Sequence, residues 1–128
     1  MANGFNIVER FNPAARAVVH EGDCREMLRG MPDGVIQLVV TSPPYNLGKE
    51  YENRLHLDDY IEDQRKVIIE CVRVLADGGS ICWQVGNFVD DGAITPLDSL
   101  LYPIFADLGL KMRNRIVWHF EHELHRQN

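Results

Sequence analysis

The segment Ser42-Pro43-Pro44-Tyr45 combines groups that could act together on a nucleobase amine. Such an amine is a poor nucleophile, because its lone pair is delocalised into the ring. Its methylation needs acceptors that hold the two N–H bonds out of the ring plane, and the Ser42 hydroxyl and the Pro43 carbonyl are such acceptors. Tyr45 offers a face for a base taken out of the duplex, and base stacking is worth roughly 1–3 kcal/mol. These four residues are therefore the candidate catalytic residues.

The two prolines follow, after Thr41 and Ser42, an apolar, β-branched segment, VIQLVV, which ends at Val40. Proline has no backbone N–H and a fixed φ, so Pro43 and Pro44 cannot extend a sheet. They are expected to hold the chain in a stiff, extended turn, whose carbonyls point outward and stay unpaired. In layered α/β sheets, ligands bind beyond the carboxyl ends of the strands. The sequence therefore predicts that TSPPYN lies at the ligand-binding edge of a sheet.

The elements that must position this segment alternate at short spacing along the chain. The predicted strands are residues 16–23, 35–42, 80–86 and 110–120, and the predicted helices are residues 23–31, 58–79 and 96–109. We expect Gly78 and Gly79 to end the second helix and Pro103 to kink or break the third. The strand over residues 35–42 is apolar on both faces, which is typical of a central parallel strand. This order predicts an α/β fold: a layered, mostly parallel sheet with flanking helices.

Composition narrows the class of protein. At 128 residues the chain is expected to form a single domain. Its net charge of −6 argues against wide contact with phosphate backbones, although it does not exclude a catalytic domain whose grip on DNA is supplied elsewhere. The 3 cysteines form no C-x-x-C pair, and no secretory leader precedes them, so we expect a reduced, cytoplasmic protein. No apolar run approaches the roughly 20 residues that cross a bilayer.

Several motifs together resemble a known family. TSPPYN is preceded by GDCREML and followed by DDY, ADGGSICWQVG and RNRIVWHFEHELH. In this order they are similar to the amino-terminal half of a DNA amino-methyltransferase of the permuted class, in which the catalytic motif precedes the cofactor motif. The resemblance covers most of the chain from about Val18. It implies a Rossmann-like fold that uses S-adenosylmethionine and acts on DNA, with no metal and no covalent enzyme intermediate.

The resemblance also implies roles for residues outside the catalytic motif. Asp23 is similar to the acidic position that contacts the adenine of the cofactor, and its neighbour Cys24 is assigned to the same site. A Gly-Asp before a helix is equally typical of a helix cap, so both interpretations of Asp23 stay open. Asn46, Lys49 and Arg54 are expected on a loop near DNA, where simple solvent exposure would explain the two basic residues as well.

One family feature is missing. The family binds the methionine part of its cofactor with a loop of the type F-x-G-x-G, and here no two glycines are separated by a single residue. The sequence therefore indicates a catalytic lobe that is incomplete: either the chain is a truncation, or a complementary polypeptide or a second copy is its expected partner. The serine of the motif favours N4 of cytosine, because a hydroxyl can accept from the amine and donate to the ring nitrogen; N6 of adenine stays open.

Three alternatives remain. The lobe could be a dimerising module without catalysis, which buries an exposed sheet face or edge. It could be half of a split methyltransferase. Related Pro-Pro-Tyr loops also serve enzymes that methylate protein amides or RNA.

His119, His122 and His125 recur every third residue, a spacing that does not stack them on one helical face, so no metal site is predicted.

Overall fold

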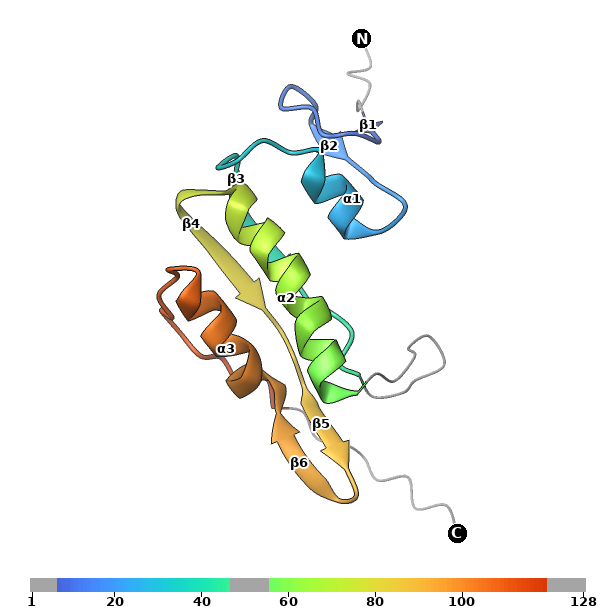
Figure 1. Cartoon of the computed structure of the whole chain (residues 1–128). Helices are drawn as coiled ribbons and strands as arrows, with labels where there is room; N and C mark the ends of the chain where they lie inside the picture. Colours follow the sequence, from blue (N-terminus) through green and yellow to red (C-terminus); the bar gives the residue numbers. More distant parts are fainter. Residues whose placement is uncertain (1–6, 47–55, 120–128) are drawn as a thin grey trace.

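The computed structural model describes residues 7–46 and 56–119. Its centre is a strand–helix–strand unit, in which β3 (Ile36–Thr41) and β4 (Leu75–Trp83) pair in parallel and α2 (Leu57–Val74) connects them. The long helix lies across the strands in Figure 1. Parallel neighbours need such a crossover, so this unit confirms the predicted α/β layering.

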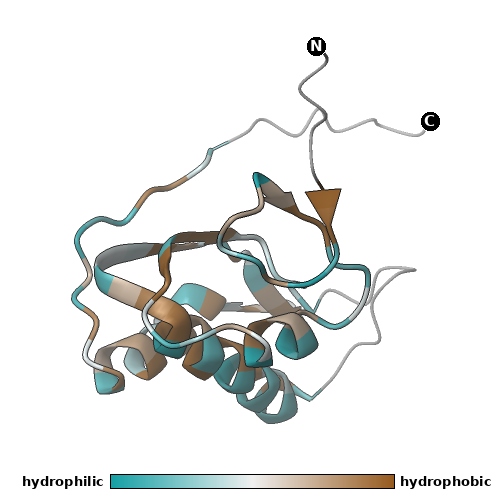
Figure 2. Ribbon diagram, turned by 90° about the horizontal axis from the view of Figure 1, so that it is seen from above, coloured by the Kyte–Doolittle hydropathy of each residue, from teal (hydrophilic) through white to brown (hydrophobic). Residues whose placement is uncertain are grey.

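Smaller elements surround the unit. They are β1 (Ile7–Val8), β2 (Ala17–Val18), α1 (Cys24–Arg29), β5 (Asn87–Asp90), β6 (Ala93–Pro96) and α3 (Leu97–Asp107). The strands form three two-stranded sheets, of which β1–β2 and β3–β4 are parallel and β5–β6 is antiparallel. Figure 2 shows α2 and α3 together on one side of the strands. Among the described helices none is long and apolar enough to span a membrane.

The core lies between the two longer helices and the strands. One cluster joins Ile68 of α2 to Leu101 and Ile104 of α3, all at most 1% exposed. A second cluster joins Tyr60 of α2 to Phe88 and Leu97 at the start of the hairpin and of α3. Tyr60 and Ile68 are spaced so that they share one face of α2, which is why the apolar stripe of this helix meets the same layer along its whole length.

The first helix begins as predicted. Asp23 has an extended backbone, and its Oδ1 accepts from the Arg25 backbone N–H at 2.8 Å, so it is the N-cap of α1. The third helix begins at Leu97 after Pro96 and ends before Gly109, whose φ of +86° suits glycine at this position. Pro103 does not break α3, which continues to Asp107.

The predicted end of the second helix was wrong. Instead of continuing to Gly78 and Gly79, α2 ends at Val74, and Leu75 already has an extended backbone. The strand register explains the two glycines: Ile36 pairs with Leu75, whereas Leu38 pairs with Ser80. The additional residues of β4 must bulge out between these pairs, and Gly78, at φ +76°, permits the turn.

Two further strand predictions were wrong, and one hairpin was not predicted. The strand over residues 16–23 is reduced to Ala17–Val18, and no strand occurs over residues 110–119, the described part of the predicted last strand. Ile116 and Trp118 are highly exposed there, so β-branched composition alone, without a neighbouring strand, did not produce a sheet. The β5–β6 hairpin was not predicted. Its turn is Asp91-Gly92, both at positive φ, as a two-residue hairpin turn requires.

Candidate functional site

The predicted catalytic and cofactor residues, except Tyr45, line one cavity. It has a volume of about 470 Å³ and lies where the chain leaves β3, beside the start of α1 and the first half of α2. Its walls include Asp23, Cys24, Arg25, Thr41, Ser42, Pro43, Pro44, Asn46, Tyr60, Asp63, Gln64, Val67 and Trp83. The fold therefore brings the Gly-Asp turn and the Ser-Pro-Pro turn, which are separate in the sequence, to the same cavity at the carboxyl end of a parallel strand.

Ser42 has a partner that the sequence analysis missed. Its hydroxyl donates to the side-chain oxygen of Gln84, with Oγ and Oε1 2.8 Å apart. Gln84 directly follows β4, and its backbone N–H donates to the Thr41 carbonyl at 2.9 Å. The sequence contained this signal, because Gln84 lies near the carboxyl end of the predicted strand over residues 80–86, which was expected to run parallel to the one that ends at Ser42.

The proline turn is attached to α2. The buried Tyr60 hydroxyl donates to the Pro44 carbonyl at 2.7 Å. The prediction that the carbonyls of this turn stay unpaired was therefore wrong for Pro44. No hydrogen bond to the Pro43 carbonyl occurs within residues 7–46 and 56–119, so this oxygen keeps its accepting capacity. One carbonyl thus fixes the turn, and the preceding one is available to a ligand.

Tyr45 and Asn46 are held more tightly than a flexible loop would hold them. The half-buried Tyr45 packs against the cluster around Tyr60, and a Cβ on Gly86 would come within 3.3 Å of its ring. Asn46 is 3% exposed at φ +59° and lines the cavity, which corrects its expected place on an exposed loop. Lys49 and Arg54 lie outside the described residues.

The Asp23 carboxylate takes part in a charged network. Arg25 Nη2 lies 2.6 Å from Asp23 Oδ2, and Arg25 Nη1 lies 3.1 Å from Asp63 Oδ1 on α2. The side-chain and backbone hydrogen bonds from Arg25 lower the pKa of Asp23 to about 2, so this carboxylate is ionised at neutral pH. Partial burial and, to a smaller extent, the nearby negative charge of Asp23 raise the pKa of the neighbouring Cys24 thiol. The cavity wall at α1 is therefore a capping carboxylate beside a neutral thiol.

Two buried polar atoms of the cavity-lining residues lack partners within the described parts of the chain. They are Gln64 Oε1 and Trp83 Nε1. The Trp83 ring is fixed edge-on against Phe105, with centroids 5.6 Å apart. Because buried polar groups are nearly always hydrogen-bonded, an orphan acceptor and an orphan donor beside one cavity fit a polar ligand such as the adenosyl part of a nucleoside cofactor.

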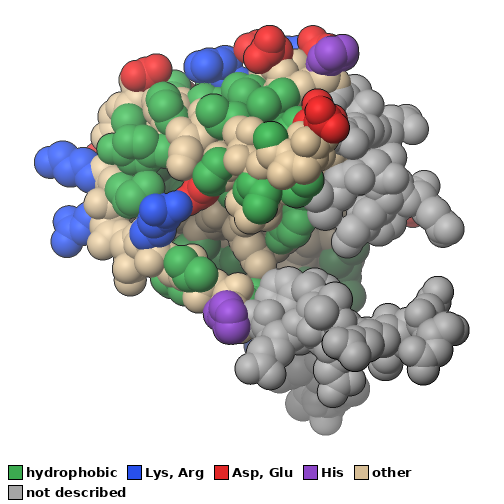
Figure 3. All heavy atoms as spheres, turned by 90° about the horizontal axis from the view of Figure 1, so that it is seen from below, with side chains coloured by type: hydrophobic (Ala, Val, Ile, Leu, Met, Phe, Trp, Pro, Cys, Tyr) green, Lys and Arg blue, Asp and Glu red, His purple; other side chains and the backbone are tan. Residues whose placement is uncertain are grey.

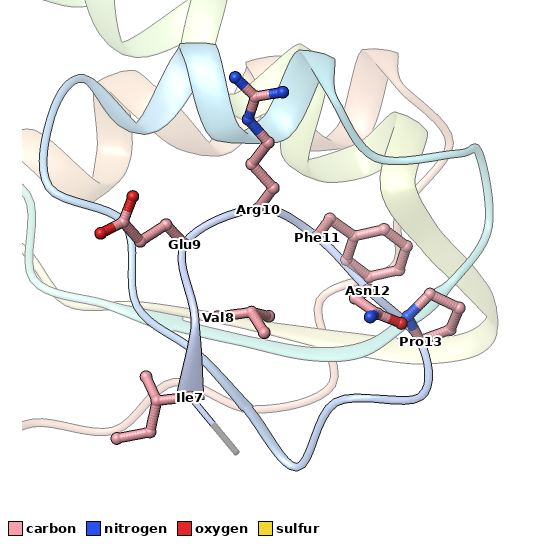
Figure 4. A pocket seen from close by; sticks show the side chains of 7 residues that line it. All are labelled: Ile7, Val8, Glu9, Arg10, Phe11, Asn12 and Pro13. Atoms are coloured by element: carbon pink, nitrogen blue, oxygen red, sulfur yellow. The ribbon is translucent and has the colours of Figure 1, made fainter.

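A second hollow has no comparable chemistry. It is formed by seven consecutive residues, Ile7 to Pro13, which curl around Val8 while Glu9 and Arg10 point outward (Figure 4). Convergent polar groups are the mark of a binding site, and the one amide among these seven residues, Asn12, already accepts a hydrogen bond from the Ala14 backbone N–H.

Basic side chains do not form a continuous surface on the face in Figure 3. On that face, hydrophobic side chains of the described residues alternate with isolated Lys, Arg, Asp and Glu side chains. The scattered charges agree with the net charge of −6. This face therefore lacks the broad positive patch that typically contacts a DNA backbone.

Comparison with known proteins identifies the family. Residues 36–128 match the DNA methylase family. The Type II methyltransferase M.BglII of Bacillus subtilis is 49% identical over 84% of this chain and 30% of its own length. The DNA adenine methyltransferase YhdJ of Escherichia coli (strain K12) is 35% identical over 88% of this chain and 36% of its own length. The chain thus spans about a third of the length of these curated relatives.

A solved structure shares the fold. A protein described as a putative DNA modification methylase, from Thermus thermophilus, superimposes with a TM-score of 0.57 at 32% identity, and the match covers 69% of this chain and 38% of that one. This likeness confirms the predicted Rossmann-like methyltransferase fold, here in incomplete form. From the family match and these relatives together, the chain belongs to the family of DNA methylases.

Proposed function

We propose that this chain is the catalytic lobe of a DNA amino-methyltransferase, which transfers a methyl group to the exocyclic amine of a flipped base. The observation that carries the proposal is the shared cavity, in which Asp23 and Cys24 lie with Ser42 and Pro43. The Type II methyltransferases among the relatives support the reaction class. Because the chain spans only about 30% of M.BglII, the activity of the whole protein is part of the proposal.

The chain's own residues prepare the base. The Ser42 hydroxyl and the Pro43 carbonyl accept from the two amine N–H bonds and hold them out of the ring plane, which frees the nitrogen lone pair. Pro44, held by Tyr60, keeps these acceptors rigid, so little reorganisation is needed during the reaction. Tyr45 provides the stacking face for the base. Lys49 and Arg54 belong to the side of the site that meets DNA, whereas the buried Asn46 lines the cavity.

The cavity fits S-adenosylmethionine as the cofactor. Asp23 and Cys24 would hold its adenosine part, and the unpaired Gln64 and Trp83 atoms offer further partners for a polar heterocycle. Bound there, the cofactor would supply an electrophilic methyl group on its sulfonium.

Cytosine N4 is the favoured target, with adenine N6 as the second candidate. The serine of the motif is the reason for the first choice, because a carboxylate at this position would suit the adenine amine. The relative YhdJ, named a DNA adenine methyltransferase, is the reason for keeping the second.

We further propose that the 128-residue chain forms one domain and requires a second component, either a polypeptide with the glycine-rich loop or another copy of the chain. Two observations support this: the chain has no Gly-x-Gly sequence, and Leu38 and Val40 of β3 are widely exposed. As an enzyme that acts on DNA, it would work in the cytoplasm.

The test is calorimetric titration of the chain, assembled with its second component, with S-adenosylmethionine, followed by transfer of a labelled methyl group. We expect saturable binding that Asp23→Asn weakens about tenfold, because asparagine keeps the helix cap but loses the charge. Asp33→Asn is the matched control, since Asp33 also forms an ion pair with an arginine, Arg73, but does not line the cavity. Methyl transfer to DNA should be lost in Ser42→Ala. Transfer to RNA or to a glutamine-containing peptide, with none to DNA, would overturn the substrate assignment.

A further inference from the structure

We propose that Gln84 reads the ring nitrogen beside the target amine, and that Ser42 and Gln84 form one base-recognition pair. This inference rests on the proposed function and deepens it. It assigns specificity to a residue that lies 42 positions from the catalytic serine in the sequence.

The backbone fixes the two residues next to each other. Val40 pairs with Cys82 and Thr41 with Trp83 in the parallel register, so Ser42 and Gln84 follow at the carboxyl ends of adjacent strands. The hydrogen bond from the Gln84 backbone N–H to the Thr41 carbonyl continues this ladder beyond Trp83. The contact between the two side chains is therefore a consequence of the strand register. A single substitution on the surface would not change that register.

Counting hydrogens defines what the pair can bind. A serine hydroxyl has one proton, and Ser42 gives it to Gln84 Oε1. Ser42 can therefore only accept from a ligand, and cannot also donate to a ring nitrogen. Gln84 has two further N–H bonds on Nε2, and no hydrogen bond from Nε2 occurs among the described residues. The pair thus presents an acceptor, Ser42 Oγ, beside a donor, Gln84 Nε2.

This arrangement is complementary to an amine beside an unprotonated ring nitrogen. Cytosine offers it at N4 and N3, and adenine at N6 and N1. On their Watson–Crick edges thymine, uracil and guanine offer a carbonyl beside a ring N–H, which reverses donor and acceptor; guanine has an amine beside an unprotonated ring nitrogen only at N2 and N3, on its minor-groove edge. Because a mismatched pairing leaves polar groups without partners, the pair should select the two amino bases that are substrates of this reaction class.

The alternative is a structural contact that ties two strand ends together. Both side chains are exposed, so such a contact would stabilise the fold only slightly. A ligand whose ring nitrogen is replaced by C–H distinguishes a base-reading role of Gln84 from a structural one. It leaves the protein unchanged and removes only the ligand atom to which Gln84 would donate.

The experiment is an NMR titration of the chain, observed at the Ser42 and Gln84 backbone amides. The probes are cytidine and 3-deazacytidine, adenosine and 1-deazaadenosine, and uridine. We expect cytidine or adenosine to bind about tenfold more tightly than its deaza analogue, and uridine to bind as weakly as the analogue. The preferred nucleoside of the two identifies the target base.

Substitutions of Gln84 test the same preference from the side of the protein. Gln84→Leu removes donor and acceptor, whereas Gln84→Glu keeps an acceptor for the Ser42 proton and removes the N–H donor. Both should abolish the preference for the natural nucleoside over its deaza analogue. The control Gln37→Leu changes an exposed glutamine of β3 and should retain the preference.

Two results would overturn the inference, and they differ in their meaning for the proposed function. If Ser42→Ala weakens nucleoside binding but Gln84→Leu leaves the tenfold preference intact, Gln84 is structural and the base site at Ser42 stands. If no nucleoside moves the amides of Ser42 and Gln84 in the unsubstituted chain, the base site itself is wrong and this inference is overturned with it.

Discussion

The two faces of the β3–β4 pair differ in what covers them. On one face α2 and α3 form a closed core, in which Ile68 is 0% exposed and Leu101 is 1% exposed. On the other face Leu38 and Val40 are 56% and 70% exposed, and the paired Cys82 is exposed as well. No described helix packs on this second face, which we call the bare face (Figures 1 and 2).

The difference shows how the candidate site is built. Residues alternate between the faces of a strand, so Ser42 and Gln84 continue the bare face beyond Val40 and Cys82. The proline turn between them and α2 is held from the covered face by Tyr60. Parallel strands are normally covered on both faces, so the base-recognition pair lies at the border of a layer that further structure would complete.

The largest difference between the two faces should appear in the free energy of unfolding when one side chain on each face is truncated. Leu101→Ala should lower the free energy of unfolding by about 3 kcal/mol, because the cavity it leaves is closed on all sides. Val40→Ala should lower it by less than about 1 kcal/mol, because the side chain is already in water. Urea unfolding followed by circular dichroism measures both. Similar losses for the two variants would mean that the bare face is covered in solution.

Thiol labelling compares the faces without a core substitution. In a Cys24→Ser background, Cys82 on the bare face should react with a maleimide at least about 100-fold faster than Cys71 at pH 8. Burial raises the pKa of Cys71 to about 11, so its thiolate is scarce at pH 8 and its labelling should accelerate as the pH rises toward that value. Mass spectrometry locates the label. Concentration-dependent protection of Cys82 would indicate a second copy on the bare face.

The link between the covered face and the proline turn should have an intermediate effect. Tyr60→Phe should destabilise the chain by about 1–2 kcal/mol, because the part-buried Pro44 carbonyl loses its donor. Tyr102→Phe, at an exposed position of α3, is the matched control and should be neutral. Thermal unfolding compares the two. Equal stability of Tyr60→Phe and the parent chain would show that water replaces this hydrogen bond and that the turn is held by its prolines alone.

The smallest expected effect has the opposite sign. Gln64 is 5% exposed on α2, and its Oε1 has no partner among the described residues. Gln64→Leu should therefore raise stability by about 1 kcal/mol, because it removes a desolvated amide from the covered side. Gln64→Glu, of similar size, should lower stability, because it adds a charge. A loss of stability in Gln64→Leu would mean that an ordered water already satisfies the amide.

Local chemistry in the sequence was sufficient for several elements. The Gly-Asp turn and its helix, the strand that leads into TSPPYN and the start of α3 could all be predicted, because a cap, a β-branched run and a proline act on the residues next to them. The Asp91-Gly92 turn carried the same kind of signal and was overlooked. The end of α2 could not be predicted from the neighbouring residues, because Gly78 permits the irregular pairing of β4 with β3 and does not end the helix.

The candidate site divides in the same way. The sequence by itself determined that Ser42 and the prolines follow a parallel strand, and that Asp23 caps a helix. Only the tertiary structure decided that Gln84 takes the Ser42 proton, that Tyr60 holds the Pro44 carbonyl and that Gln64 Oε1 has no partner in the described part of the chain. The first two contacts join residues 42 and 16 positions apart. Their existence depends on strand register and on the packing of α2, and neither is encoded in the propensities of the residues themselves.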